Sequence, residues 1–413
     1  MADYVSRLAD ATLPQLLMSL PAVLLVGPRA TGKTTTARRY ATSVARLDRP
    51  AEAAAFVADP DAALRVLVEP ILLDEWQAVP SVLGAVKRAV DDDPRPGRFL
   101  LTGSVTADLQ AETWPGTGRV VRVPMYGLTM RERLGRVHGP GFVDLLASDA
   151  LSQLSLPAEL PDLAGYVDLA LQGGFPEPVV GTATAARTIW LEGYVDQLLT
   201  RDAAGIAGCD PVRLRRYFEE LALNSAGLAE QQTLLDAAGL NRKTADAYEQ
   251  LLVNLLVLDL VPAWFSNRLL RLVKSPKRYL VDASLMAAAL QLDVAAVLRD
   301  GNLLGRVLDT FVAAQLRPEV ALSQRRARLY HLRERNERRE IDLLAEVGAQ
   351  QVVGIEVKAT AAPTPGDAQH LTWLRRVLGQ RFAAGVVLHT GPGRFALGEH
   401  VMAMPIAALW GQR

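Results

Sequence analysis

Short, fully apolar runs alternate with helical segments over the first 130 residues of the chain. The runs at 22–26, 70–73 and 99–101, the last preceded by Arg98, are short enough for strands and show no polar alternation, which is typical of strands buried on both faces of a parallel sheet. A helix is expected around 82–90, and residues 119–123 add a further strand. This order predicts an α/β, doubly wound domain over residues 1–130, with a ligand at the carboxyl ends of its strands.

A helical pattern follows. Residues 131–210 are predicted to form a helical linker region, and residues 211–289 a winged-helix-like domain. In the latter, a helix at 214–223, a shorter helix at 233–238 and a glycine break precede a longer helix that opens with Arg242 and Lys243. Strand-like segments at 258–264 and 277–282 would form the wing. Arg242 and Lys243 would contact DNA, since readers of this type place contacts at that helix end. The alternative is a module that only packs inside the protein.

The last third, residues 290–413, combines one helix with strands. The helix runs through 305–312, and three strand-like segments follow at 328–332, 339–345 and 352–358, with the charged stretch 333–338 as a turn. Period-two spacing places Glu356 and Lys358 on one face of the last strand.

The first apolar run leads directly into a phosphate-binding loop. The segment has the pattern G-x-x-x-x-G-K-[ST] between a strand and a helix. Its glycines let backbone N–H groups converge on phosphate at a helix N-terminus, whose dipole favours anions. The predicted nucleotide-binding residues are Gly27, Pro28, Arg29, Ala30, Thr31, Gly32, Lys33, Thr34 and Thr35. The sequence therefore predicts that the chain binds a nucleoside triphosphate, with ATP as cofactor.

Two acids at the end of the second apolar run predict hydrolysis as well as binding. Lys33 would contact the β- and γ-phosphates, and the Thr34 hydroxyl would be a ligand of Mg²⁺. Asp74 would hold the same Mg²⁺ through its water shell, and Glu75 would orient and polarise the attacking water. Ser104, at the end of the third run, would report on the γ-phosphate, with a helix cap or turn as the alternative.

An arginine that meets the developing negative charge is expected in such a site. Arg119 is the first candidate for this catalytic role and Arg201 the second. Such an arginine can come from a neighbouring copy, which would imply self-association. An exposed or salt-bridged arginine is the alternative for both.

The C-terminal strands carry a second group of chemically active residues. Asp342 lies on one strand, and Glu356 and Lys358 on the next. Two carboxylates that hold a metal and a lysine near the attacking water are the arrangement of Mg²⁺-dependent nucleases. Asp342 and Glu356 are therefore predicted metal ligands, with Asp309 assisting. A hairpin with solvated charges, or a nuclease-like fold that only grips DNA, is the alternative.

The charge balance, the cysteine count and the longest apolar stretch limit the classes of protein to which the chain can belong. Lys+Arg and Asp+Glu number 45 each among 413 residues, so no overall basic field indicates nucleic acid and any DNA contact must use local patches. Cys209 is the single cysteine, which excludes a disulfide framework and suits a reducing compartment. The longest apolar stretch, 251–265, is interrupted by Asn254, Asp259 and Pro262. We therefore expect a cytoplasmic protein without a membrane partner.

The motifs together resemble one group of proteins: prokaryotic AAA-superfamily ATP-binding proteins with a C-terminal domain of unknown function. The resemblance spans nearly the whole chain and rests on LLVGPRATGKTT, ILLDEWQ, LLTGS, GGFPE, SPKRYLVDASL, EID with IEVK, and MPIAALW. It implies an AAA-type P-loop NTPase domain, a winged-helix-like middle and a C-terminal PD-(D/E)XK-nuclease-like α/β domain. Asp309 stands where this nuclease fold often carries a glutamate, and its shorter side chain departs from the pattern.

Three functions are compatible with these features. The first is an ATP-hydrolysing protein that acts on DNA, in its most ambitious form a remodelling or translocating motor. The second is a nucleotide-dependent switch that binds protein partners. The third is an ATP-regulated, Mg²⁺-dependent nuclease. DNA stimulation of ATP turnover would separate the first from the second, and strand scission would identify the third.

Overall fold

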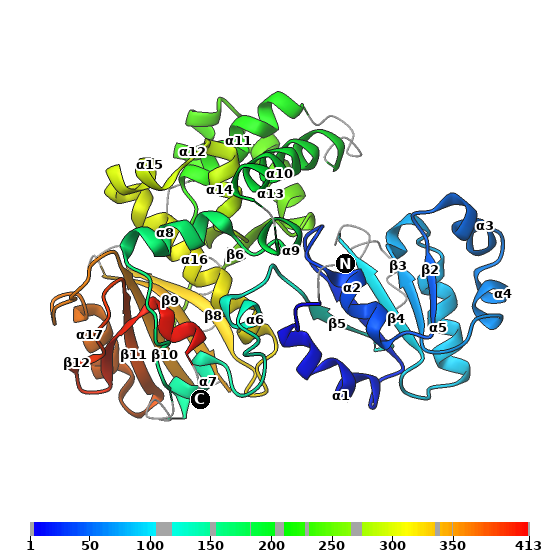
Figure 1. Ribbon diagram of the computed structural model, residues 1–413, viewed down its shortest axis with the longest axis horizontal. Helices are drawn as coiled ribbons and strands as arrows, with labels where there is room; N and C mark the ends of the chain where they lie inside the picture. Colours follow the sequence, from blue (N-terminus) through cyan, green and yellow to red (C-terminus); the bar gives the residue numbers. More distant parts are fainter. Residues whose placement is uncertain are drawn as a thin grey trace.

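The fold described below is that of a computed structural model, over residues 4–104, 118–148, 154–181, 183–202, 210–227, 231–265, 275–334, 339–348 and 350–411. Figure 1 shows the N-terminal sheet at one end of the molecule, with the helical middle part and the C-terminal sheet together at the other. Across these described residues, no helix is long and apolar enough to cross a membrane.

The N-terminal domain is a parallel sheet of five strands in the order β2-β3-β4-β1-β5. All four strand pairs are parallel, which confirms the predicted α/β fold of a P-loop NTPase. The strands are β1 Ala22–Val26, β2 Ser43–Arg46, β3 Ile71–Asp74, β4 Phe99–Gly103 and β5 Val120–Pro124. The helices are η1 Leu8–Ala11, α1 Leu13–Leu17, α2 Lys33–Ala37, η2 Arg38–Tyr40, α3 Pro50–Ala58, α4 Pro60–Arg65, η3 Trp76–Ala78 and α5 Val82–Asp92.

Both faces of this sheet are buried, which explains why its central strands are apolar up to the polar residues at their carboxyl ends. Leu24, Leu73 and Leu101 point into one core with α5, while Leu25 and Leu72 point into the other with α1 and α2. Since the strands are parallel, their carboxyl ends meet at one edge, and the residues that follow β1, β3 and β4 come together there.

The middle of the chain is helical. Its elements are α6 Met130–Arg133, α7 Phe142–Ala147, α8 Leu163–Gln172, α9 Pro176–Val179, α10 Thr184–Gln197, η6 Leu198–Asp202, α11 Pro211–Leu223, α12 Gln231–Ala238, α13 Arg242–Asn254, β6 Leu258–Val261, β7 Lys277–Leu280, α14 Ala283–Leu290, α15 Val294–Arg299 and α16 Gly301–Ala321. The predicted order of three helices and two strands is present as α11, α12, α13, β6 and β7, with β6 and β7 antiparallel.

The C-terminal sheet has six strands in the order β12-β13-β11-β10-β9-β8. Its elements are β8 Arg328–Glu334, β9 Arg339–Val347, β10 Gln351–Lys358, α17 Gln369–Leu378, η8 Gly379–Arg381, β11 Phe382–His389, β12 Phe395–Gly398, β13 Val401–Pro405 and η9 Ile406–Trp410. The three predicted strands are β8 to β10, and they pair antiparallel. Much of the predicted turn at 333–338 lies outside the described residues.

One large core joins the helical middle part to the C-terminal sheet. It includes Tyr217 of α11, Leu285 of α14, Leu308 of α16 and Ile355 of β10. A smaller core lies on the other face of that sheet, under α17. This large core contains residues from both sides of the expected domain boundaries at residues 210 and 289. The division of the chain into domains at these two residues stays a prediction. The large core makes α16 a shared support of both parts.

Candidate functional site

The phosphate-binding loop begins directly after β1 at the carboxyl edge of the sheet. Gly27 is required there, because a Cβ atom at this position would lie 1.8 Å from the carbonyl oxygen of Met125. Gly32 takes a φ of 87° as it leads into α2, a conformation that glycine adopts without strain. Arg29, Ala30 and Thr35 are exposed at the surface of this segment.

Lys33 is the buried cation of the loop. Its Nζ donates to the carbonyl oxygens of Gly27 at 3.0 Å and Pro28 at 2.6 Å. Burial lowers the pKa of Lys33 to about 8, although the nearby carboxylates of Glu75 and Asp74 oppose this shift. The ammonium therefore lies inside the loop, where the phosphates of a nucleotide bind in such motifs.

Thr34 and Asp74 meet at the start of α2, as the sequence predicts. The Thr34 Oγ1 donates to Asp74 Oδ1 at 2.6 Å, and the buried Thr102 hydroxyl of β4 donates to the same oxygen. A hydroxyl and a carboxylate within one hydrogen bond of each other are hard oxygen ligands of the kind that Mg²⁺ prefers. These two residues thus fit the predicted Mg²⁺ site beside the loop.

Glu75 follows β3 in a left-handed conformation, with φ 54° and ψ 51°. Such backbone strain in a residue other than glycine is concentrated at functional sites. Its Oε2 accepts hydrogen bonds from Gln77 and, at 3.3 Å, from the Ser104 hydroxyl. Ser104 is itself buried at the end of β4. Gln77 was not among the predicted site residues, although it lies in the quoted ILLDEWQ segment.

The outer side of the loop faces α10. Arg29 and Ala30 line a cavity of about 430 Å³ together with Trp190, Tyr194 and Arg201 from α10 and η6. The Trp190 and Tyr194 rings are stacked, with their centroids 5.4 Å apart. Arg201, the second candidate for the charge-stabilising arginine, therefore borders the nucleotide loop of its own chain.

Arg119 lies at the opposite end of the sheet. The residue after it, Val120, pairs with Ala22 at the start of β1, whereas the phosphate-binding loop follows the other end of that strand. A five-residue strand separates the two edges by roughly 13 Å or more. The Arg119 Nε instead donates to Asp91 Oδ1 at 2.7 Å. Arg119 is therefore remote from the phosphate-binding loop of its own chain, and its contact with a γ-phosphate, which would have to be that of a neighbouring copy, stays a prediction.

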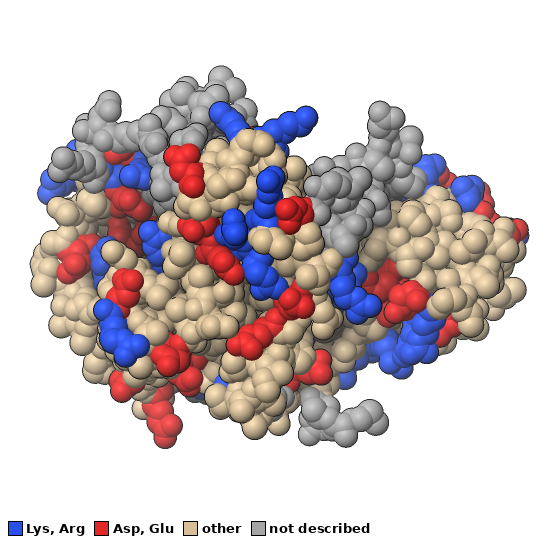
Figure 2. Space-filling view, turned by 90° about the horizontal axis from the view of Figure 1, so that it is seen from above, with Lys and Arg blue, Asp and Glu red and all other residues tan. Residues whose placement is uncertain are grey.

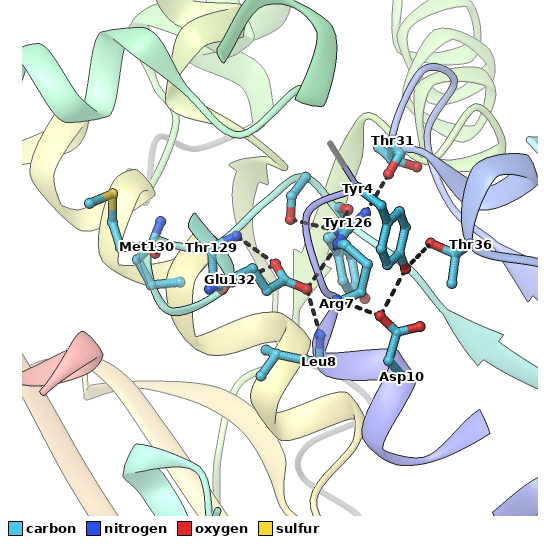
Figure 3. Close-up of polar contacts among 12 residues, drawn as sticks. Tyr4, Arg7, Leu8, Asp10, Thr31, Thr36, Tyr126, Thr129, Met130 and Glu132 are labelled. Carbon is cyan, nitrogen blue, oxygen red and sulfur yellow. Dashed lines mark hydrogen bonds and ion pairs between the residues drawn. The ribbon is translucent and has the colours of Figure 1, made fainter. Parts of the chain in front are cut away.

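Arg7 connects the loop to the segment after β5, a contact that the sequence gave no reason to expect (Figure 3). Its side chain is almost completely buried. The guanidinium donates to the carbonyl oxygens of Thr31 at 2.7 Å and Tyr126 at 2.7 Å, and to Glu132 Oε1 at 3.0 Å. One cation therefore fixes the backbone of the phosphate-binding loop relative to α6.

Glu132 and its neighbours continue this connection toward α16. Glu132 accepts from the backbone nitrogens of Leu8 at 2.8 Å and Thr129 at 2.7 Å. The next backbone nitrogen, that of Met130, donates to Gln315 Oε1 on α16 at 2.7 Å. The buried Arg131 then pairs with Glu319, one turn further along the same helix. An unbroken set of buried polar contacts thus leads from the loop to α16.

The C-terminal acids also come together, but with a partner that the sequence analysis missed. Asp342 Oδ2 accepts from the backbone nitrogen of Val357 at 3.0 Å, so Asp342 lies beside Glu356 on the neighbouring strand. Lys358 Nζ lies 3.0 Å from Glu356 Oε2. Asp309 of α16 pairs instead with Lys277 of β7, at 2.7 Å. Lys277 stands in the quoted SPKRYLVDASL segment, whose spacing gives no sign of this contact.

Burial and the neighbouring charges shift the pKa values of the ionisable side chains in this cluster. Burial raises the pKa of Glu356 well above its usual value, and the Asp342 carboxylate adds to the effect. Burial alone would lower the pKa of Lys277, but the carboxylates of Asp309 and Asp342 and the Tyr279 hydroxyl more than offset it. Lys277 is therefore a cation at neutral pH.

The predicted DNA-contacting residues lie at the surface. Asn241 caps α13 by accepting from the backbone nitrogen of Thr244 at 2.9 Å. Arg242 and Lys243, the first two residues of that helix, are exposed, and Arg242 makes a loose ion pair of 3.9 Å with Asp246. Figure 2 shows basic and acidic side chains interspersed over the upper face of the molecule, without a continuous field of one sign.

Three segments of the chain match protein families. Residues 19–134 match an AAA domain. Residues 163–296 match one domain of unknown function (DUF8612), and residues 304–409 match another (DUF4143).

Two mycobacterial proteins are similar over nearly the whole chain. An uncharacterised protein of Mycobacterium tuberculosis is 29% identical over 404 residues, which cover 97% of this chain and 83% of that protein. An uncharacterised protein of Mycobacterium bovis gives the same values.

Two solved structures are distantly similar. A Walker-type ATPase of Pyrococcus abyssi is 13% identical with a TM-score of 0.42, over 70% of this chain and 96% of that one. The ORC2 protein of Aeropyrum pernix, solved as ADPNP-ADP complexes, is 12% identical with a TM-score of 0.29, over 74% and 92%. Scores this low support no conclusion about this chain. The phosphate-binding loop, the parallel sheet around it and the match of residues 19–134 show that the chain carries an AAA-type P-loop domain, and the match of residues 304–409 shows that a C-terminal domain of unknown function follows it.

Proposed function

We propose that the protein hydrolyses ATP and uses the turnover to rearrange C-terminal parts that engage DNA. The observation that carries the ATPase half is the meeting of Lys33, the Thr34–Asp74 pair and Glu75 at one edge of the parallel sheet. Each has a separate task in phosphoryl transfer, and all of them come from segments that end at this edge.

The chain's own residues divide the work of hydrolysis. The loop nitrogens and Lys33 would bind the phosphates, and Thr34 and Asp74 would hold Mg²⁺. The bound ion would supply positive charge beside the phosphates. Glu75 would accept a hydrogen bond from the attacking water and orient it. Gln77 and Ser104, both within hydrogen-bonding distance of Glu75 Oε2, would hold this carboxylate in position.

Two features support the DNA half of the proposal. In the helical middle part, α13 presents Arg242 and Lys243 at an exposed N-terminus, and the antiparallel pair β6–β7 follows it in the manner of a wing. In the C-terminal sheet, antiparallel β8, β9 and β10 are followed by α17 and by β11, which pairs parallel to β10. That order supports the PD-(D/E)XK-nuclease-like fold implied by the sequence resemblance.

The polar contacts from Arg7 to α16 support coupling between the two halves. A change in the loop on ATP binding or hydrolysis would act on Thr31, whose carbonyl oxygen accepts from Arg7. Arg7 is paired with Glu132, and the neighbouring Met130 and Arg131 contact Gln315 and Glu319 of α16. Because α16 packs against β8 and β10, movement of this helix would reach the C-terminal sheet.

A DNA-binding titration at several salt concentrations tests the DNA half. We expect Arg242→Ala/Lys243→Ala to weaken binding across sequences and to lower the slope of log affinity against log salt by up to about two units. Arg65→Ala/Arg95→Ala is the matched control, since it removes two exposed arginines from the N-terminal domain. Equal affinity of both variants and the unaltered protein would assign α13 to internal packing and would favour a nucleotide-dependent switch that binds protein partners.

A further inference from the structure

Lys277 is a fully buried lysine whose ammonium group lies among the carboxylates of the C-terminal site. Only 1% of its side chain is exposed. Its Nζ lies 2.7 Å from Asp309 Oδ2 and 3.5 Å from Asp342 Oδ1. Lys277 comes from β7 in the middle part of the chain, whereas the two acids come from α16 and β9, so the contact joins three separate segments.

The protein itself supplies a donor to each oxygen of these two carboxylates. On Asp309, Lys277 contacts Oδ2, and the Tyr279 hydroxyl donates to Oδ1 at 3.2 Å. On Asp342, Lys277 contacts Oδ1, and the Val357 backbone nitrogen donates to Oδ2 at 3.0 Å. A divalent cation that used either carboxylate as a ligand would lie beside the Lys277 ammonium, and the repulsion between the two positive charges opposes its binding.

The remaining acid, Glu356, is a poor metal ligand as it stands. The Lys358 ammonium lies 3.0 Å from Glu356 Oε2 and would repel a cation bound there. The buried Oε1 of Glu356 makes no hydrogen bond, but each of the other five carboxylate oxygens of Asp309, Asp342 and Glu356 has a donor, and one oxygen alone does not make a divalent cation site. Consistently, no cluster of three or more His, Cys, Asp or Glu residues within the described part of the chain is placed to hold a metal ion. The residues present therefore do not fit the metal that the nuclease-like fold implies.

We propose that the Lys277 ammonium takes the place of a divalent cation in this site, so that the nuclease-like domain holds its acids together without metal and does not cut DNA. The part of this inference that concerns DNA rests on the proposed function, whereas the absence of metal binding stands independently of it. Lys277 also fastens β7 to α16 and β9, which places the wing-like strand pair at a fixed position beside the C-terminal sheet.

A titration with Mn²⁺ alone, followed by calorimetry and by electron paramagnetic resonance, tests the proposal. Asp74→Asn serves as the background, because it removes the carboxylate that would hold Mg²⁺ in the ATP site, so that the measured Mn²⁺ binding is that of the C-terminal acids. We expect no binding of Mn²⁺ at about 1 mM, the weak end of protein cation sites. Binding that disappears on adding Asp342→Asn or Glu356→Gln would overturn the proposal, as would Mn²⁺-dependent cleavage of DNA that Glu356→Ala abolishes.

Lys277→Met in the same background provides the second arm. Removal of the ammonium leaves Asp309 and Asp342 without their cation, so we expect Mn²⁺ binding to appear, at least tenfold tighter than in the parent, and to be lost again with Asp342→Asn. A folded Lys277→Met protein that binds no Mn²⁺ would contradict the assignment of Lys277 to the cation position. Since loss of a buried cation can prevent folding, the titration with Lys277 intact decides by itself. Neither arm depends on whether DNA stimulates the ATPase.

Discussion

Arg7→Met should weaken both the folded state and nucleotide binding, because one buried guanidinium holds three parts of the ATP site together. Arg7 donates to the Thr31 and Tyr126 carbonyl oxygens and to Glu132, all at 3.0 Å or less. The side chains of Arg7 and Glu132 are 4% and 2% exposed. Solvent therefore cannot replace the lost contacts.

The size of the effect follows from these contacts. Removing one partner of a buried ion pair costs about 3–5 kcal/mol of unfolding free energy. Glu132 keeps its donors at Leu8 and Thr129, so we expect the lower end, about 3 kcal/mol. Glu132→Leu should cost a similar amount because it leaves Arg7 unpaired. The double variant should cost less than the sum of the two by about 2 kcal/mol, since it removes both charges together.

Urea unfolding of the unaltered protein and the three variants, followed by circular dichroism, measures this cycle. Titration with a fluorescent ATP analogue measures the second effect. Without Arg7 the Thr31 carbonyl loses its donor, and we expect ATP affinity to fall about tenfold or more, equivalent to about 1.4 kcal/mol. Strictly additive losses in the cycle would refute the ion pair as a stabilising unit. Unchanged ATP affinity in a folded Arg7→Met protein would refute the role of Arg7 in positioning the loop.

Three further predictions concern the ATP site. Lys33→Ala should abolish tight nucleotide binding, whereas Glu75→Gln should keep ATP bound and cut turnover by about 10²-fold or more. Equal loss of ATP affinity in both variants would mean that Glu75 is not the residue that orients the attacking water. Because the pKa of Lys33 is about 8, ATP affinity should be constant below that pH and fall above it by up to about tenfold per unit as the ammonium loses its proton. Lys33→Arg, which stays charged, should show no such fall. Arg201→Ala should bind ATP normally and hydrolyse it slowly. Arg119→Ala should show the same slow hydrolysis only if copies of the chain associate. Normal turnover in both variants would mean that neither arginine stabilises the transition state.

The ATP site was largely predictable because its parts are local in sequence. The loop is one continuous motif, and Asp74, Glu75 and Ser104 end apolar runs that could only be buried parallel strands. The strand order then brings those ends together without further information. Arg119 lies far from the loop of its own chain for the same topological reason: it precedes its strand, and the amino end of a parallel strand lies away from the ligand edge.

The contacts that the sequence could not reveal are those between distant segments. Arg7 and Glu132 are 125 residues apart, and Lys277 and Asp309 are 32 residues apart. An arginine near the N-terminus or a lysine in a short strand is normally exposed, and nothing in its local pattern marks it as buried. The acids Asp342 and Glu356 were correctly expected to lie together, but the ammonium between Asp342 and Asp309 depends on how β7 packs against α16.

Steady-state ATP hydrolysis with and without single-stranded, duplex and branched DNA tests the proposed function most directly. We predict that the unaltered protein hydrolyses ATP, that at least one DNA form raises the rate, and that Glu75→Gln shows neither the basal nor the stimulated rate. A rate that is identical with and without all three DNA forms would contradict the action on DNA, and absence of hydrolysis in the unaltered protein would contradict the ATPase itself.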